Sequence, residues 1–137
     1  MTKEKSCGAV VFTKMNNEIK YLIEEMIQGH FALPKGHVEA GETEIQTAAR
    51  EIKEETNLDV TFLTSFKEVT NYMPAVNVSK DVIYFLAEAN IPSTMRKQPE
   101  EVEELYWLNF EEAVSRLTFD NDKEILRNAH EYLTNMK

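Results

Sequence analysis

Several glutamates and one arginine between residues 42 and 55 form a pattern that could hold a divalent cation. Glu51, Glu54 and Glu55 are three and four positions apart, so their carboxylates would be neighbours on a helix. Glu42 precedes this group, and Arg50 lies beside it. Like charges at such a spacing destabilise an isolated helix by about 0.2–0.5 kcal/mol per pair, so the group needs a compensating partner. The spacing alone leaves two interpretations open: a solvated acidic face, or a site where Mg²⁺ bridges carboxylates and a substrate phosphate.

The residues around this group predict a glycine-containing loop followed by a helix over Thr43–Thr56. Thr43 and Gln46 have the spacing of a capping box, which favours a helix start at this point. Apolar side chains recur with the helical period at positions 45, 48, 49 and 52. The three glutamates fall on a different face, about 115° away. Asn57 follows, and asparagine tolerates the left-handed conformation that ends many helices.

The remaining sequence predicts strands on both sides of this helix and two more helices near the end of the chain. The expected strands are Ala9–Thr13, Ile19–Met26, Val60–Thr70, Val82–Ala89 and Leu105–Leu108, and the expected helices are Phe110–Leu117 and Lys123–Met136. An Asn16-Asn17 turn would join the first two strands. This mixed order indicates an α/β or α+β fold with helices packed on a mixed sheet. A length of 137 residues suits one domain over residues 1–137.

Composition narrows the partners that we expect. The formal net charge is −9, whereas proteins that bind nucleic-acid duplexes present a basic face, so we expect no duplex as a partner. No apolar run approaches the roughly 20 residues that span a bilayer, and the N-terminus lacks the apolar core of a secretory signal, so we expect no membrane. Cys7 is the single cysteine, which excludes an intrachain disulfide, and it lies in a run typical of a buried strand. These features are typical of a cytoplasmic protein.

The loop and helix together resemble the Nudix box, the signature of the Nudix hydrolases. The shared pattern comprises Gly36, Glu42, Arg50-Glu51-Ile52, Glu54-Glu55 and Asn57-Leu58. Asn57 stands where the family has glycine, and we expect the helix end to survive this change. The resemblance implies an α/β/α sandwich, in which the loop–helix–loop of the box lies on one side of a mixed sheet and the C-terminal helices lie on the other.

The resemblance also implies roles for the residues of the box. It implies that the divalent cofactor, Mg²⁺ with Mn²⁺ as a substitute, is held by Gly36, Glu51, Glu54 and Glu55. One of Glu54 and Glu55 would also deprotonate or orient the attacking water. Arg50 would orient a glutamate through charge-assisted hydrogen bonds, which a planar guanidinium makes better than a lysine does.

Further residues would support this site from outside the helix. The resemblance implies that Gly41 and Glu42 support the loop and the metal cluster. A second acidic run, residues 100–104, corresponds to a carboxylate that completes the metal or base set; Glu101 aligns best and Glu103 second. Residues 39–55 and 100–104 each carry a net charge of −4, so they hold most of the charge of the chain. We expect these two segments to face one another around the metal.

Short blocks along most of the chain resemble one Nudix subfamily, the asymmetrical bis(5′-nucleosyl)-tetraphosphatases. The blocks are residues 6–12, 33–39, 66–68, 71–72, 80–88 and 106–108, together with 129–133. The resemblance implies hydrolysis of a small dinucleoside polyphosphate, such as diadenosine tetraphosphate, to ATP and AMP. It implies that Lys35, His37 and Lys80 contact phosphate and that Tyr72 and Tyr84 stack on adenine. From the residues alone, a surface histidine at 37 and ordinary sheet packing of Tyr84 are alternatives.

Two other functions fit the same residues. The first keeps the chemistry and changes the substrate to an oxidised nucleoside triphosphate, a nucleotide sugar or the 5′ end of RNA. The second is a non-catalytic domain that senses a nucleotide, although the intact arginine and glutamates of the box argue against it. Both a monomer and a dimer are compatible with the sequence.

Overall fold

The computed structural model describes residues 1–136, which form a seven-stranded mixed sheet flanked by helices. The strands are β1 (Thr2–Met15), β2 (Glu18–Met26), β3 (Phe31–Ala32), β4 (Lys35–His37), β5 (Val60–Ala75), β6 (Val78–Ala89) and β7 (Val102–Leu108). The helices are α1 (Glu44–Thr56), α2 (Phe110–Arg116) and α3 (Asp120–Asn135), with a 3₁₀ turn, η1, at Pro92–Thr94. The predicted fold class is confirmed.

Strand β1 joins the two parts of this sheet. It pairs in parallel with β6 along one edge, and antiparallel with β2 and β4 along the other. Beyond β6 the sheet continues to β5, while β2 carries β3 and β7 as further antiparallel partners. The short strand β4 therefore lies against the first half of β1, directly before the loop that leads into α1.

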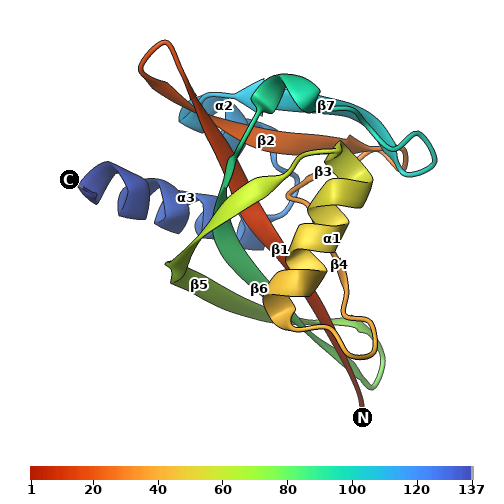
Figure 1. Ribbon diagram of the computed structural model, residues 1–137. Coiled ribbons are helices and arrows are strands. Elements are labelled where there is room, and N and C mark those ends of the chain that lie inside the picture. The colour runs from red at the N-terminus through yellow and green to blue at the C-terminus, as the bar shows by residue number, and fades with distance from the viewer. Residues whose placement is uncertain (137) are drawn as a thin grey trace.

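Helices cover both sides of the sheet, and the alternation of side chains along β1 shows why. Cys7, Ala9 and Val11 point toward α1, whereas Val10 and Phe12 point toward α2 and α3. All five are buried, as a strand covered on both faces requires. Figure 1 shows α1 and α3 on opposite sides of β1 and β6. This is the expected α/β/α sandwich, and Cys7 is the buried core thiol that the sequence predicts.

Local signals in the sequence explain where the elements begin and end. Asn16 and Asn17 both have positive φ, 52° and 66°, which suits the tight two-residue turn between β1 and β2. The capping box at the start of α1 is present in both directions between Thr43 and Gln46. Asn57 ends α1 in the left-handed conformation at φ 64°, as predicted, and its N–H donates to the carbonyl of Lys53.

The strands are longer than the sequence predicts. β1 begins at Thr2 rather than Ala9, and the β5–β6 hairpin extends to Ala75 and Val78. Residues 2–5 of β1 are polar and exposed, and the tip of the β5–β6 hairpin is exposed with no alternation of apolar and polar side chains, so neither has the pattern that indicates a strand. Pairing of β1 and β5 with β6 holds these extensions in place. No helix within residues 1–136 is long and apolar enough to cross a membrane.

Candidate active site

Arg50 is the centre of a network of ion pairs on the exposed side of α1. Its guanidinium donates to both carboxylate oxygens of Glu42, from Nε at 2.7 Å and from Nη2 at 3.1 Å. Nη1 donates to Glu51 at 2.8 Å and to Glu54 at 3.0 Å. Nη2 also donates to the carbonyl of His37 at 2.9 Å. One planar group therefore connects the loop, the end of β4 and two turns of the helix, which a lysine could not do.

Glu42 is the most fully satisfied carboxylate of the site. Besides Arg50, it accepts hydrogen bonds from the backbone N–H of Glu39 at 3.0 Å and from the buried hydroxyl of Thr47 at 2.8 Å. These hydrogen bonds, the one from Arg50 foremost, lower the pKa of Glu42 to about 2. Gly41, immediately before it, adopts φ 82°, a backbone conformation that is strained for residues other than glycine. The loop is thus built around an ionised Glu42.

Gly36 lets the backbone of β4 approach the carboxylate of Glu51. A Cβ at position 36 would lie 2.0 Å from the carboxylate carbon of Glu51, so no other residue fits without a shift. On β4 the neighbouring side chains of Lys35 and His37 point to the opposite face of the strand. Gly36 is therefore the contact between β4 and the carboxylates of α1.

The structure corrects the expectation that all three box glutamates lie on a face apart from the apolar stripe of the helix. The side chain of Glu54 is 51% exposed, but Glu55 is buried, only 5% exposed. The helical positions explain this, because Glu55 follows Ile52 by three residues and Ala48 by seven, on the edge of the buried stripe. Burial, followed by the negative charge of Glu24, raises the pKa of Glu55 far above its usual value.

Glu24 of β2 is a residue of this site that the sequence analysis missed. It is 1% exposed, and one of its carboxylate oxygens and one of Glu55 are buried without a hydrogen-bond partner. Burial also raises the pKa of Glu24 above its usual value; a hydrogen bond with Glu55 and the charge of Lys35 oppose this effect, while Glu51 and Glu101 add to it. The available signal is the strand period, because Glu24 shares the inward face with Leu22, where a charged residue is unusual.

Lys35 lies between the carboxylates and a second feature, a half-enclosed pocket of about 250 Å³. Burial raises the pKa values of Glu24 and Asp122, and the charge of Lys35 opposes part of this rise at both residues. Within residues 1–136, Lys35 makes no ion pair of its own. The pocket is lined by Lys35, Thr70, Tyr72, Val82, Tyr84, Phe119, Asn121 and Asp122.

The aromatic residues of this pocket differ in their exposure. Tyr72 is 39% exposed, and Nζ of Lys80 lies 6.0 Å from the centre of its ring on the facing strand. Tyr84 is 1% exposed, and its hydroxyl donates to Asp122 at 3.2 Å, so Tyr84 packs in the core as the sheet-packing alternative describes. Phe119 is 53% exposed at the N-terminal end of α3 and was not predicted, because its place against Tyr72 depends on how α3 docks.

The second acidic segment lies beside the C-terminal end of α1. The N–H groups of Arg96 and Gln98 donate to the carbonyls of Thr56 and Glu55, at 2.8 and 3.2 Å. Glu101 is exposed, and its charge is among those that raise the pKa of Glu24. Its carbonyl accepts from Ile27 at 3.0 Å, which ties the segment to the end of β2. The structure thus brings Glu101 to the same end of the site as Glu24 and Glu55.

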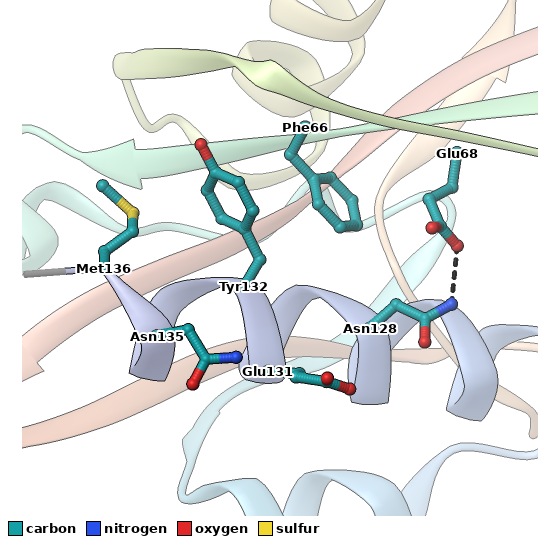
Figure 2. A pocket seen from close by; sticks show the side chains of 7 residues that line it. All are labelled: Phe66, Glu68, Asn128, Glu131, Tyr132, Asn135 and Met136. Atoms are coloured by element: carbon teal, nitrogen blue, oxygen red, sulfur yellow. Dashed lines mark hydrogen bonds between the residues drawn. The ribbon is translucent and has the colours of Figure 1, made fainter.

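A larger cavity, of about 460 Å³, lies elsewhere, between α3 and β5 (Figure 2). Its base is formed by Phe66 and Tyr132, and Asn128 donates to Glu68 across it at 2.7 Å. It is on the α3 side of the sheet, away from the carboxylates of α1. Among residues 1–136 no lysine, arginine or histidine lines it, and two glutamates do, so these residues do not suit a phosphate ligand.

The residues around α1 fit a divalent cation in their chemistry. They offer the carboxylate and carbonyl oxygens that Mg²⁺ and Mn²⁺ prefer, and two buried carboxylate oxygens, of Glu24 and Glu55, have no other partner. Among the described residues, no three acidic, histidine or cysteine side chains already converge as a ligand set. The ion pairs of Glu51 and Glu54 with Arg50 account for this, because they draw both carboxylates toward the guanidinium.

The sandwich fold and the arginine-linked carboxylates of one loop and helix define the class of this protein. The family model for the NUDIX domain matches residues 4–129, so the chain belongs to the Nudix family, and the resemblance seen in the sequence is confirmed. The chain is 33% identical to the asymmetrical bis(5′-nucleosyl)-tetraphosphatase of Sus scrofa, over 96% of this chain and 97% of that protein. It is 34% identical to the Mus musculus protein of the same name, over 94% and 95%.

A solved structure is similar over the same length. It is the crystal structure of a Caenorhabditis elegans Ap4A hydrolase binary complex, which superimposes with a TM-score of 0.88. The two are 30% identical, and the match covers 97% of this chain and 99% of that one. The likeness therefore extends through β5, β6 and α3, which form the aromatic pocket, and is not limited to the loop and helix.

Proposed function

We propose that this protein hydrolyses dinucleoside polyphosphates of the diadenosine tetraphosphate type to ATP and AMP, with Mg²⁺ as cofactor. The observation that carries this proposal is that Lys35 lines the aromatic pocket while the next residue of β4, Gly36, lies against the carboxylate of Glu51. A polyphosphate chain that ends in a base needs a cation site and a basic side chain for its phosphates, with an aromatic pocket next to them for the base. The near full-length similarity to tetraphosphatases and to an Ap4A hydrolase supports the choice of substrate.

The residues of the site would have different roles in the reaction. Gly36, Glu51, Glu54, Glu55 and Glu101 would hold the divalent cation. When bound, the cation would lower the pKa of water and offset the charge of the phosphates. Arg50, with Glu42, fixes the directions of Glu51 and Glu54 through the hydrogen bonds described above.

Proton transfer and attack follow from exposure. Glu54 or Glu55 accepts the proton of the attacking water. Glu54 is the better candidate for this base, because its carboxylate is exposed and that of Glu55 is buried. The water oxygen forms a bond to one phosphorus, and the bond from that phosphorus to a bridging oxygen breaks in line with it. The bridging oxygen leaves with the other product, so that one side becomes ATP and the other AMP.

The substrate is oriented by the basic and aromatic residues. Lys35, His37 and Lys80 would contact phosphate oxygens, which offsets the negative charge that the carboxylates present to the substrate. Tyr72, exposed at the rim, would stack on one base, a contact that contributes about 1–3 kcal/mol and accepts different bases. Tyr84 would form the floor of the pocket beneath it.

Product analysis in ¹⁸O-labelled water tests this proposal. Diadenosine tetraphosphate with Mg²⁺ should give ATP and AMP in equal amounts, with the label in one product only. Glu54→Gln and Glu55→Gln should each lower turnover by orders of magnitude while the fold survives, and Glu124→Gln, an exposed change on α3, should not. Two molecules of ADP, or near-wild-type turnover of both variants, would contradict the proposal. Oxidised nucleoside triphosphates, a nucleotide sugar and capped RNA, assayed in parallel, separate the alternative substrates.

A further inference from the structure

The buried pair of carboxylates on β2 and α1 lies beside the proposed metal site but is only half accounted for by it. Glu55 belongs to the box, and Glu24 belongs to none of the motifs that indicate the function. We propose that Glu24 is a further ligand of the divalent cation, which it holds together with Glu55. This inference depends on the proposed function only in that it requires a divalent-cation site.

Burial without a partner is the first observation. Glu24 is 1% exposed, and its Oε2 atom has no hydrogen-bond donor within residues 1–136; the same holds for Oε1 of Glu55. A buried carboxylate normally finds a donor or a cation, because desolvation without compensation costs several kcal/mol. The two carboxylates are within hydrogen-bond reach of each other and share a proton when no cation is bound, so a divalent cation can take the place of that proton.

The position of Glu24 on the sheet is the second observation. It is paired with Leu105 of β7 and Ala32 of β3, and Leu105 belongs to the core layer beneath α1. Directly opposed residues on antiparallel strands point to the same face, so the carboxylate of Glu24 points to the α1 side. Both flanking strands hold β2 in place, which gives a rigid base from which an oxygen ligand can be presented.

The charges around the pair are the third observation. Glu51 and Glu101 add negative charge near Glu24, and Lys35 is the one cation that acts on it. Lys35 makes no ion pair with Glu24 or Glu55 among the described residues, and it also acts on Asp122, on the other side of the sheet. Glu24 therefore has more negative than positive charge around it, since Glu51 is already paired with Arg50, and a divalent cation would supply the positive charge that the nearby side chains lack.

Binding of Mn²⁺ alone, with no substrate present, tests the inference. Electron paramagnetic resonance of free Mn²⁺ gives affinity and stoichiometry for the wild-type protein and for Glu24→Gln. Gln keeps the shape of the side chain and removes the charge, so we expect about tenfold to hundredfold weaker binding at one site. The rise in melting temperature on addition of Mg²⁺ should shrink in parallel, while the metal-free variant melts at or above the wild-type temperature.

Two further variants make the outcome decisive. Glu25→Gln changes the neighbouring residue on the opposite face of β2, where Glu25 accepts from the hydroxyl of Tyr106 at 2.8 Å, and it should bind Mn²⁺ as the wild type does. Glu24→Leu replaces the carboxylate with an apolar side chain like those around it, in case Gln does not fold. Unchanged Mn²⁺ affinity in whichever Glu24 variant folds, or an equal loss in Glu25→Gln, would overturn the inference.

Measurement without substrate also separates this inference from the proposed function. If Glu24→Gln loses Mn²⁺ while the wild type cleaves no dinucleoside polyphosphate, the inference stands and the substrate assignment fails. If the wild type cleaves diadenosine tetraphosphate and Glu24→Gln binds Mn²⁺ normally, the function stands and Glu24 is a packing residue only.

Discussion

Two carboxylate groups at opposite ends of α1 have opposite electrostatic surroundings. Near the first turns of α1, Glu42 is matched by Arg50, by a backbone N–H and by a hydroxyl, and its pKa falls to about 2. Near the last turn, Glu55 faces Glu24 with no donor for one oxygen of each, and both pKa values rise because of burial. The length of α1, about three and a half turns, separates the compensated Glu42 from the uncompensated Glu55.

This difference separates the part of the site that is complete from the part that awaits a ligand. The Glu42–Arg50 network needs nothing from outside the chain, so it stabilises the loop in every state of the protein. The Glu24–Glu55 pair is held in place by the strands and the core, at a cost in stability. Buried polar groups that lack a partner are rare in proteins, and the pair is therefore the place where we propose that a cation binds.

Removal of Arg50 should have the largest effect, because it takes away the one donor that Glu42, Glu51 and Glu54 share. Arg50→Gln leaves Glu42, Glu51 and Glu54 without their common donor, so we expect a loss of about 2 kcal/mol in the free energy of unfolding. Turnover should fall about tenfold to hundredfold, since the carboxylates lose their orientation. Urea denaturation and steady-state kinetics measure the two effects. Lys53→Gln, which changes an exposed lysine of α1, is the control, and equal stability of both variants would refute the role of Arg50.

The two groups should also respond to pH in opposite directions in metal-free protein. The pKa of Glu42 is lowered from 4.5 to about 2 on folding, so its stabilisation is present above pH 4.5 and disappears as the pH falls toward 2. The pKa of Glu55 is raised above 4.5, so its contribution is present below pH 4.5 and is lost as the pH rises.

Difference curves against the matching Gln variants test this directly. In EDTA, Glu55→Gln should gain stability relative to the wild type above pH 4.5, with a slope of at most about 1.4 kcal/mol per pH unit. The stability deficit of Glu42→Gln should instead shrink below pH 4.5. Urea unfolding followed by circular dichroism from pH 3 to pH 9 gives both curves. Parallel curves for the two variants would show that the two groups do not differ as described.

The compensated group was open to prediction from sequence, whereas the uncompensated one was not. The capping box of Thr43, the helix end at Asn57 and the polar spacing of Glu51 and Glu54 are local patterns, and the structure has each of them. Burial of Glu55 depends on what packs against the edge of the helix. That neighbour, Glu24, is 31 positions earlier in the chain, and only the pairing of β2 with β7 and β3 brings it there.

The same reason explains what else the sequence left out. Strand β4 has three residues, too few for a periodic pattern, and exists because Lys35–His37 pairs with β1. The place of Lys35 between two surfaces and the contact of Gly36 with Glu51 both follow from that pairing. Phe119 joins Tyr72 in one pocket because α3 docks on the sheet. Features that need two distant segments were thus inaccessible to arguments from spacing.

A smaller change within the compensated group tests how much a single hydrogen bond to Glu42 contributes to the free energy of unfolding. Thr47→Val keeps the shape and β-branching of the side chain and removes the hydroxyl that donates to Glu42 at 2.8 Å. Because Thr47 is fully buried and Glu42 keeps its other donors, we expect a loss of about 1 kcal/mol in the free energy of unfolding. Thr61→Val, at an exposed position on β5, should change stability by less. A stability change as large as that of Arg50→Gln would mean that the hydroxyl, not the guanidinium, holds the loop.

The smallest effect on stability should come from Lys35, although it is the one cation that acts on the uncompensated pair. Lys35→Met keeps the length of the side chain and removes its charge, which acts on Glu24 without a direct ion pair. We expect less than about 0.5 kcal/mol in the free energy of unfolding at pH 8. A double-mutant cycle with Glu24→Gln isolates the coupling, which should be measurable in metal-free protein and disappear when Mg²⁺ supplies the positive charge instead. Coupling that persists unchanged with Mg²⁺ would mean that Lys35, rather than a divalent cation, is the partner of Glu24.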